Sequence, residues 1–381
     1  MSMFSRRLVA RTGALFVAFA CLCIGAVGAG EPYTWDLPPR VPEPRLPQGA
    51  VMTNATVELG RHLFYDKRLS GNGTQSCASC HVQELAFTDG RAQGRGSTGE
   101  LHPRGPMSLV NVAYRDALTW ANPSIRTLEQ HALIPMLGAR PVELGMAGQE
   151  TRIYAELRAD GTYKRLFARA FPGDKVLVNR DQIAIALAAF QRSIVSFNSP
   201  FDRYRYYGET NALDESARRG MKLFFSDKAS CGSCHMAHNV PHLGLNLDGG
   251  SKHKESKSDE PEVFFFHNTG LYSLGSPFPY PADNLGLYEH THVLRDVGRF
   301  RIPTLRNIAV TAPYMHDGSI ATLEEVLDHY VAGGRARNPQ QADFMKPLDL
   351  NARDREDIIA FLRSLTDETV LSDARWSNPW D

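Results

Sequence analysis

Two copies of the pattern Cys-x-x-Cys-His are the residues whose type and spacing most clearly suggest chemistry in this sequence. The positions are Cys77, Cys80 and His81 in the first copy, and Cys231, Cys234 and His235 in the second. Two thiols at this spacing can attach a porphyrin through thioether bonds, and the adjacent histidine can bind its iron. Zinc and redox sites also use Cys-x-x-Cys, but the repeated histidine favours covalently bound haem. The sequence therefore predicts two haem c groups held by these residues.

The first residues of the chain indicate an exported protein. Residues 1–30 contain three arginines and no acidic residue, then an apolar stretch that ends in small residues, which is typical of a secretory signal peptide. Of the six cysteines, only Cys21 and Cys23 lie outside the two motifs, so none in the mature chain is left for a disulfide. We expect a periplasmic protein that has no membrane span once residues 1–30 are removed.

The overall composition is that of a soluble globular protein. Hydrophobic residues make up 43% and charged residues 22% of the 381 residues. The formal net charge is +0, so the sequence gives no indication of a nucleic acid or an anionic membrane surface as a partner. A chain of this length can form two domains with separate cores.

The elements that would position the two motifs are repeated. Residues 60–65 read GRHLFY before the first motif, and residues 220–225 read GMKLFF before the second. Apolar residues recur at helical spacing over 183–197 and 358–365, whereas alternating strand patterns are scarce. The sequence thus predicts a mainly α fold of two cytochrome c-like haem domains related by internal duplication.

The expected boundaries follow from these repeats and from proline and glycine content. Because many prolines follow the predicted signal peptide, we expect an extended segment before the first domain. A stretch rich in small and charged residues, and the histidines around it, are expected at the surface. The ranges are a Pro-rich lead-in over 31–50, an N-terminal domain over 51–200, a C-terminal domain over 201–381, a surface loop over 244–262, and surface histidines within 238–292.

Several longer stretches resemble the bacterial di-haem cytochrome c peroxidase and MauG superfamily. They are LGRHLFYDKRLSGNG (59–73), SLVNVAY (108–114), LEQHALIP (128–135), PVELG (141–145) and RIPTLRNIAVTAPYMHDGS (301–319). Together they span most of the chain after residue 50. The resemblance implies a di-haem enzyme that acts with hydrogen peroxide. The sequence of these stretches is most similar to that of the MauG branch, which includes di-haem enzymes associated with methanobactin copper-uptake systems.

The resemblance also implies the axial ligands of both irons. Peroxidases of this family usually place a methionine fourteen residues after the histidine of a PY-x-H motif, here His316. This chain has Tyr330 at that place, as the MauG branch does. Tyr330 also lies on the apolar face of a helix that begins with a capping box, so a packed core tyrosine is the alternative. At the first haem, Ser97 replaces the histidine that blocks the iron in many relatives, which implies an open iron at His81, although His102 lies nearby.

Three further positions match residues that take part in peroxide chemistry in the family. Glu143 of the PVE motif is expected to move a proton between the peroxide oxygens. His131 stands where the family has a glutamine and could donate or accept a proton at neutral pH, with Gln130 one residue out of register. Trp120 matches a tryptophan between the haems that relays charge. The alternatives are that Glu143 and His131 are ordinary surface residues and that Trp120 only packs in the core.

A calcium ion and a partner are the last implications of the resemblance. Thr311 and Pro313 match carbonyl donors to a calcium ion, but Gly105 replaces the family's asparagine, which leaves Ca²⁺ open. A MauG-type enzyme would keep two oxidising equivalents and oxidise a residue, such as tryptophan to kynurenine, on a periplasmic and copper-binding partner protein. The alternatives are a cytochrome c peroxidase supplied with electrons by a small cytochrome or cupredoxin, and a non-enzymatic electron carrier.

Overall fold

The structure is a computed structural model that describes residues 30–235, 266–273, 279–336 and 338–381. Nearly all of the predicted signal peptide and the whole of the expected surface loop over 244–262 lie outside these residues. Within the described ranges, no helix combines the length and apolar character that a membrane crossing needs.

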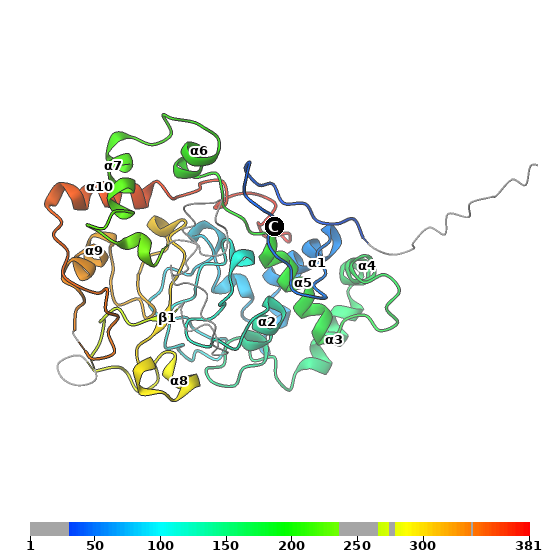
Figure 1. Ribbon diagram of the computed structural model, residues 1–381. Coiled ribbons are helices and arrows are strands. Elements are labelled where there is room, and N and C mark those ends of the chain that lie inside the picture. The colour runs from blue at the N-terminus through cyan, green and yellow to red at the C-terminus, as the bar shows by residue number, and fades with distance from the viewer. Residues whose placement is uncertain (1–29, 236–265, 274–278, 337) are drawn as a thin grey trace, which may run out of the picture.

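The described residues are mainly helical, which confirms the predicted fold class (Figure 1). The first half contributes α1 (Asn54–Tyr65), α2 (Leu128–Leu137), α3 (Glu150–Ala159), α4 (Gly161–Ala170) and α5 (Arg180–Ser193). The second half contributes α6 (Pro200–Tyr206), α7 (Glu215–Phe224), α8 (Tyr288–Thr291), α9 (Leu323–Val331) and α10 (Ala352–Arg363). Two short strands, β1 (Phe266–His267) and β2 (Phe300–Arg301), pair antiparallel between the two groups of helices.

The apolar side chains form two main cores, one in each half of the chain. The first is built on α1 to α5 and the second on α7, α9 and α10. Figure 1 shows the two groups of helices at opposite ends of the molecule, with irregular chain between them. Each attachment motif begins with a single turn of 3-10 helix beside its own core, at Cys77–Ser79 and Cys231–Ser233. The two halves therefore present the two motifs in the same local setting.

The repeated glycine before each motif lies where two helices cross closely. A Cβ added to Gly60 on α1 would lie 1.9 Å from the carbonyl oxygen of Ala186 on α5. One added to Gly220 on α7 would lie 1.7 Å from the carbonyl oxygen of Asp357 on α10. These distances are far below any van der Waals contact, so only glycine permits either crossing. The duplicated sequence string is thus the signature of a duplicated helix pair.

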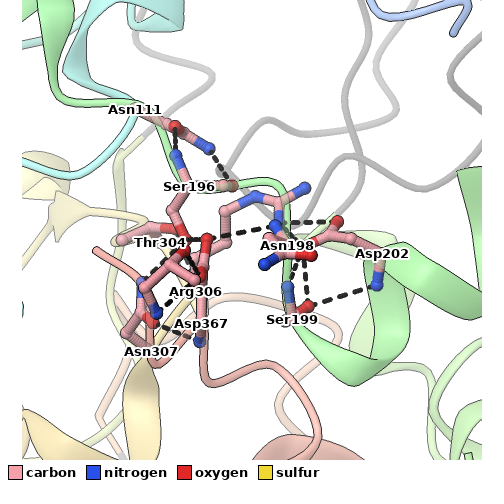
Figure 2. A network of polar contacts seen from close by, with 10 residues as sticks. Asn111, Ser196, Asn198, Ser199, Asp202, Thr304, Arg306, Asn307 and Asp367 are labelled. Atoms are coloured by element: carbon pink, nitrogen blue, oxygen red, sulfur yellow. Dashed lines mark hydrogen bonds and ion pairs between the residues drawn. The ribbon is translucent and has the colours of Figure 1, made fainter. Parts of the chain in front are cut away.

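A polar network joins the halves where the chain passes from one to the other (Figure 2). Asn111 accepts a hydrogen bond from the backbone N–H of Ser196 at 2.8 Å, and its amide donates to the Ser196 carbonyl at 3.2 Å. On the other side, Asn307 donates to Ser196 Oγ at 3.1 Å and accepts from the backbone of Asp367 at 2.7 Å. Both asparagines are buried and have positive φ, at 55° and 60°. The segments 109–113 and 305–309 thus form a second pair of repeated turns, which meet at Ser196.

Beside this network lies a buried ion pair. Arg306 donates to both carboxylate oxygens of Asp202 at 2.9 Å, and the two side chains are 1% and 0% exposed. The Arg306 guanidinium also lies 4.4 Å from the centre of the Phe197 ring. Since Phe197 belongs to the first core, the pair contributes to the contact between the halves.

The C-terminal tail returns to the first core. Val370 and Trp376 are part of that core, and the Trp376 indole donates to the Ser193 carbonyl on α5 at 3.1 Å. Tyr65 at the end of α1 donates to the Trp376 carbonyl at 2.6 Å. Figure 1 shows the C-terminus beside α1 and α5. The expected boundary at residue 200 remains a prediction, but the N-terminal core is completed by the last residues of the chain.

Candidate haem sites

The first attachment motif presents a histidine that is prepared to bind iron. Nδ1 of His81 lies 2.8 Å from the carbonyl oxygen of Phe87, which can only accept a hydrogen bond. Nδ1 therefore carries the proton, and Nε2 has a free lone pair. Burial lowers the pKa of His81, so the ring is neutral at neutral pH, as a metal ligand must be. Phe87 as the partner of this histidine was not foreseen from the sequence.

Glu143 and His131 are both brought to this motif. Burial, and then the charges of neighbours that include Glu143, raise the pKa of the Cys77 thiol to about 12 and that of Cys80 to about 11. The charge of Glu143 therefore acts on both thiols. His131, on α2, is close enough to His81 for their charges to interact. The structure thus groups the two candidate proton-transfer residues with the first motif, and their catalytic role stays a prediction.

The surroundings give these two residues different protonation states. Burial raises the pKa of Glu143 to about 7, so both its forms are populated near neutral pH. Burial, with the charges of His81 and Arg301, lowers the pKa of His131 to about 4. The imidazolium form of His131 is therefore scarce at neutral pH, and its role in proton transfer stays a prediction. As a neutral ring it can still form hydrogen bonds or accept a proton.

Ser97 and His102 lie on the loop after the first motif. The Ser97 hydroxyl donates to the Leu144 carbonyl at 3.1 Å, and its backbone N–H donates to the Glu143 carbonyl at 2.7 Å. Ser97 therefore fixes the backbone that carries Glu143. Nδ1 of His102 accepts from the backbone N–H of Arg104 at 3.2 Å, and its charged neighbours are Arg104 and Glu289. These contacts tie His102 to Arg104, and an open position at His81 stays a prediction.

The second motif opens into a cavity of about 230 Å³ with a largely apolar lining. Cys231, Cys234 and His235 line one part of it, and Tyr330, from α9, lines another. Burial lowers the pKa of His235 to about 4, and its Nδ1 has no hydrogen-bond partner in the described part of the protein. Burial, with the charges of the two thiols, raises the pKa of Tyr330. Two thiols, a neutral imidazole and a phenol in one apolar cavity fit a covalently attached haem.

Trp120 lines this same cavity while belonging to the first half of the chain. Its indole donates to the Gly105 carbonyl at 2.8 Å, and its own carbonyl accepts from the backbone N–H of Arg301 at 2.9 Å. The Arg301 charge in turn acts on His131 at the first site. Trp120 therefore lies in the cavity of the second motif and is hydrogen-bonded to Arg301, and its place between the two sites and its relay role stay predictions.

The structure adds cavity residues that the sequence did not reveal. His267 was expected at the surface, but it lines the cavity, because the pairing of β1 with β2 places it there, where its ring meets Phe344. His290 and His292 are exposed, as expected. Arg301 also lines the cavity, and its place inside the motif RIPTLRN was the available signal. His238, His242 and His253 lie outside the described residues.

The calcium positions lie near one another. The backbone N–H of Gly105 donates to the His316 carbonyl at 3.0 Å, which places Gly105 beside the segment that contains Thr311 and Pro313. Gly105 offers no side chain to a cation, and the Thr311 hydroxyl donates to the Ile308 carbonyl at 3.2 Å. Calcium at this place stays a prediction.

A sequence model of the family described as "Di-haem cytochrome c peroxidase" matches residues 54–211. A cytochrome-c peroxidase of Denitromonas iodatirespirans, IdrP1, is 35% identical over 92% of both chains. The methylamine utilization protein MauG of Methylorubrum extorquens is 33% identical over 87% of this chain and 83% of its own length. A solved MauG-like protein associated with microbial copper homeostasis is 44% identical, covering 92% of this chain and all of that chain, with a TM-score of 0.83.

The chain belongs to the di-haem cytochrome c peroxidase and MauG family. It is a haem peroxidase enzyme that uses hydrogen peroxide, with two cytochrome c-type domains, as the sequence predicted. Membership of this family implies two c-type haems. The relatives divide between cytochrome c peroxidases and MauG proteins, so the family alone does not decide between these two activities.

Proposed function

We propose that the protein is a MauG-type oxidase, exported to the periplasm, that uses hydrogen peroxide to oxidise a tryptophan residue on a copper-binding partner protein, with kynurenine as the product. The oxidation to N-formylkynurenine takes four electrons and consumes two molecules of peroxide, and hydrolysis then releases the formyl carbon as formate. The observation that carries this proposal is Tyr330, which shares the cavity of the second motif with His235. A phenolate ligand stabilises higher oxidation states of iron, which suits an enzyme that must keep oxidising equivalents until a partner docks.

The residues of this chain have separate roles in the proposal. His81 and His235 would each bind one haem iron, and the haems would supply the electron exchange with peroxide. Glu143, with a pKa of about 7, takes a proton from one peroxide oxygen and returns it to the other. His131 stays neutral and offers a hydrogen bond inside the same site. Trp120 lies between the two sites and carries an electron from one to the other.

The MauG-like structure from copper homeostasis supports the choice of partner. Its likeness extends over 92% of this chain at 44% identity, whereas the cytochrome c peroxidase of Denitromonas iodatirespirans is 35% identical. A periplasmic copper-binding protein that contains an accessible tryptophan is therefore the partner class we infer. The predicted signal peptide over 1–30 is consistent with that compartment.

The test is the addition of stoichiometric hydrogen peroxide to the purified diferric protein, followed by optical and low-temperature EPR spectroscopy. We expect the ferric signals of both haems to disappear together and to return slowly when no partner is present. Mass spectrometry of candidate partners then identifies the oxidised tryptophan. A diferric protein that ignores peroxide and reacts only after one-electron reduction would overturn the proposal.

A conventional cytochrome c peroxidase is the second candidate, and one observation favours it. Met315 and Met345 also line the cavity of the second motif, and either sulfur is a possible iron ligand in such an enzyme. The near-infrared charge-transfer band of a ferric Met-ligated haem distinguishes the two cases. Its presence in the wild-type protein, with steady turnover in the presence of a small reduced cytochrome, would establish this second function.

Calcium forms a separate part of the proposal. We infer that backbone carbonyls of Thr311 and Pro313 can bind Ca²⁺ between the halves of the molecule. Metal analysis of the protein after exhaustive dialysis, with and without a chelator, tests this inference. One calcium ion per chain that the chelator removes supports it, and none contradicts it.

A further inference from the structure

Arg301 is a buried cation that has no carboxylate partner in the described part of the protein. Its side chain is 6% exposed. One guanidinium nitrogen, Nη2, lies 2.7 Å from the Met107 sulfur, and Nη1 lies 3.5 Å from the carbonyl oxygen of Ile302. The third nitrogen, Nε, is buried and has no hydrogen-bond partner. A thioether and one long contact leave most of this group's five donors unsatisfied.

The other buried arginines are compensated. Arg306 is 1% exposed and donates twice to Asp202, and Arg192 is 3% exposed and donates to both oxygens of Glu129 at 2.7 and 2.8 Å. Arg301 is instead subject to the positive charge of Arg115, and burial together with that charge lowers its pKa. Enclosing a guanidinium without an anion is strongly unfavourable, because the charge loses its hydration. The position of Arg301 therefore calls for an anion that the polypeptide does not provide.

The space beside Arg301 indicates which anion this is. Arg301 lines the cavity of the second motif, together with Trp120 and His235. That cavity fits a haem, and the two propionates are the anionic groups of a haem. A planar guanidinium binds a carboxylate with two parallel hydrogen bonds, which suits the free donors of this side chain.

We propose that Arg301 binds a propionate of the haem attached at Cys231 and Cys234, and that it positions Trp120 against this haem. The second part follows from the backbone of the same residue, whose N–H donates to the Trp120 carbonyl at 2.9 Å. One residue thus connects the anionic edge of the haem to Trp120. The inference rests on the proposed haem at the second motif.

The test compares R301Q with R301K in the holoprotein by spectroelectrochemical titration of both haems without peroxide. We expect R301Q to lower the midpoint potential of the haem attached at Cys231 and Cys234, because the cation that offsets the propionate charge and favours the reduced iron is lost. A shift confined to the other haem would contradict the assignment. R301K keeps the positive charge, so its midpoint potential should lie close to the wild-type value. Resonance Raman bands of the propionate bending modes should shift in R301Q. Both variants should retain two covalent haems by the pyridine haemochrome assay.

Two control variants separate this role from simple packing. M107L removes the sulfur contact and keeps the Arg301 charge, so both midpoints should stay at their wild-type values. R299Q removes a neighbouring arginine that pairs with Asp296 at 3.2 Å, and it should also leave the midpoints unchanged. Wild-type midpoints in R301Q, or an equal shift in M107L, would overturn the proposal. A midpoint that moves with added formate or chloride in the wild-type protein would show that Arg301 binds a free anion, which also overturns it.

These results are independent of the proposed oxidation of a partner. Because the titration uses no peroxide, failure of the Arg301 proposal leaves the MauG-type function untouched. Failure of the peroxide test likewise leaves the midpoint comparison valid. A wild-type protein that carries one haem, by contrast, would remove the second site on which both proposals depend, and the haemochrome assay detects that case directly.

Discussion

Burial gives Glu143 and His131 different protonation states near neutral pH. Burial disfavours the charged form of each residue, so the carboxyl pKa rises to about 7 while the imidazole pKa falls to about 4. Near neutral pH the carboxyl group can exchange a proton in either direction. The imidazole cannot, because almost all of it is already neutral. A general acid–base residue works best when its pKa lies near the working pH, which favours Glu143.

We predict that E143Q reduces the second-order rate constant for peroxide by about 10²- to 10⁴-fold. In the wild-type protein this rate should rise as the pH passes through about 7, since the carboxylate form accepts the peroxide proton. Stopped-flow spectroscopy between pH 5 and 9, a range of about two pH units on each side, measures both effects. H131Q is the matched variant, and its rate should keep the wild-type pH profile. A wild-type profile in E143Q would contradict the assignment.

The titration of Glu143 also affects the stability of the folded protein. The peroxide rate should rise with pH, whereas the contribution of Glu143 to stability should fall. A carboxyl group whose pKa is raised on folding favours the folded state while it is protonated, and this advantage is lost as the pH rises toward the folded-state pKa of about 7. We therefore predict that E143Q is more stable than the wild-type protein at pH values above 7 and gains least at acidic pH. Urea unfolding at both pH extremes tests this. If the difference in unfolding free energy between E143Q and the wild-type protein is the same at both pH values, Glu143 is not buried in the holoprotein.

Tyr330 is the residue that most directly separates the two candidate functions. Burial raises its pKa, so the phenol ionises only if a cation such as ferric iron lies against its oxygen. We predict that Y330F raises the midpoint potential of one haem, because a phenolate that favours ferric iron is lost. Spectroelectrochemistry and EPR measure the change, and Y280F, which alters another cavity tyrosine, should leave the midpoint unchanged. An unaltered EPR spectrum in Y330F would refute ligation.

At the scale of the elements, each motif depends on one close crossing of two helices. Gly60 on α1 meets the backbone of α5, and Gly220 on α7 meets the backbone of α10. Phe64, which follows Gly60 by one turn, lies 6.5 Å from the ring of His81. Phe224 lies in the same relation to Gly220 and is 6.3 Å from the ring of His235. Each crossing therefore helps to position an aromatic ring relative to the histidine of its motif.

We predict that G60A and G220A each lower the free energy of unfolding by at least about 2 kcal/mol, because the new methyl group forces two backbones apart. Thermal unfolding of the apo and holo proteins measures the loss. G161A on α4 is the control, since the nearest heavy atom to its added Cβ is 3.6 Å away, at the end of the Arg165 side chain. Wild-type stability in G60A would mean that the helices cross less closely than described.

At the scale of the whole molecule, the two halves are joined by polar groups buried at their junction. Ser196 forms hydrogen bonds with Asn111 of one half and with Asn307 of the other (Figure 2). Beside them, Asp202 forms an ion pair with Arg306. The C-terminal tail adds a second connection through Trp376. These contacts limit relative motion of the two halves, and therefore of the two candidate haem sites.

We predict that D202A costs about 3–5 kcal/mol of stability, since it leaves the Arg306 guanidinium buried without its partner. A double substitution of Asp202 and Arg306 by apolar residues should cost less than the single one. Chemical denaturation followed by circular dichroism measures both. E324A breaks the exposed pair with Arg363, and its effect should stay within about 1 kcal/mol. If D202A and E324A lower the free energy of unfolding by the same amount, the ion pair between Asp202 and Arg306 is not desolvated.

The sequence predicted most of the candidate site because its members occur in short local patterns. The two Cys-x-x-Cys-His motifs, the helical periodicity and the repeated glycine string are each readable within a few residues. Glu143, Trp120 and Tyr330 required the family resemblance, since a single acidic or aromatic residue has no local pattern. His267 was placed wrongly, because strand pairing between distant segments decided its burial.

By itself, the sequence determined the mainly helical fold and its duplication, and it predicted the haem-attachment residues. These features depend on covalent chemistry and on contacts between residues close in the chain. Only the tertiary structure decided which distant groups share a cavity, namely Trp120 with Tyr330 and Arg301 with His235. It also decided the pKa values of Glu143 and His131, because burial is produced by the packing of the whole chain around a group.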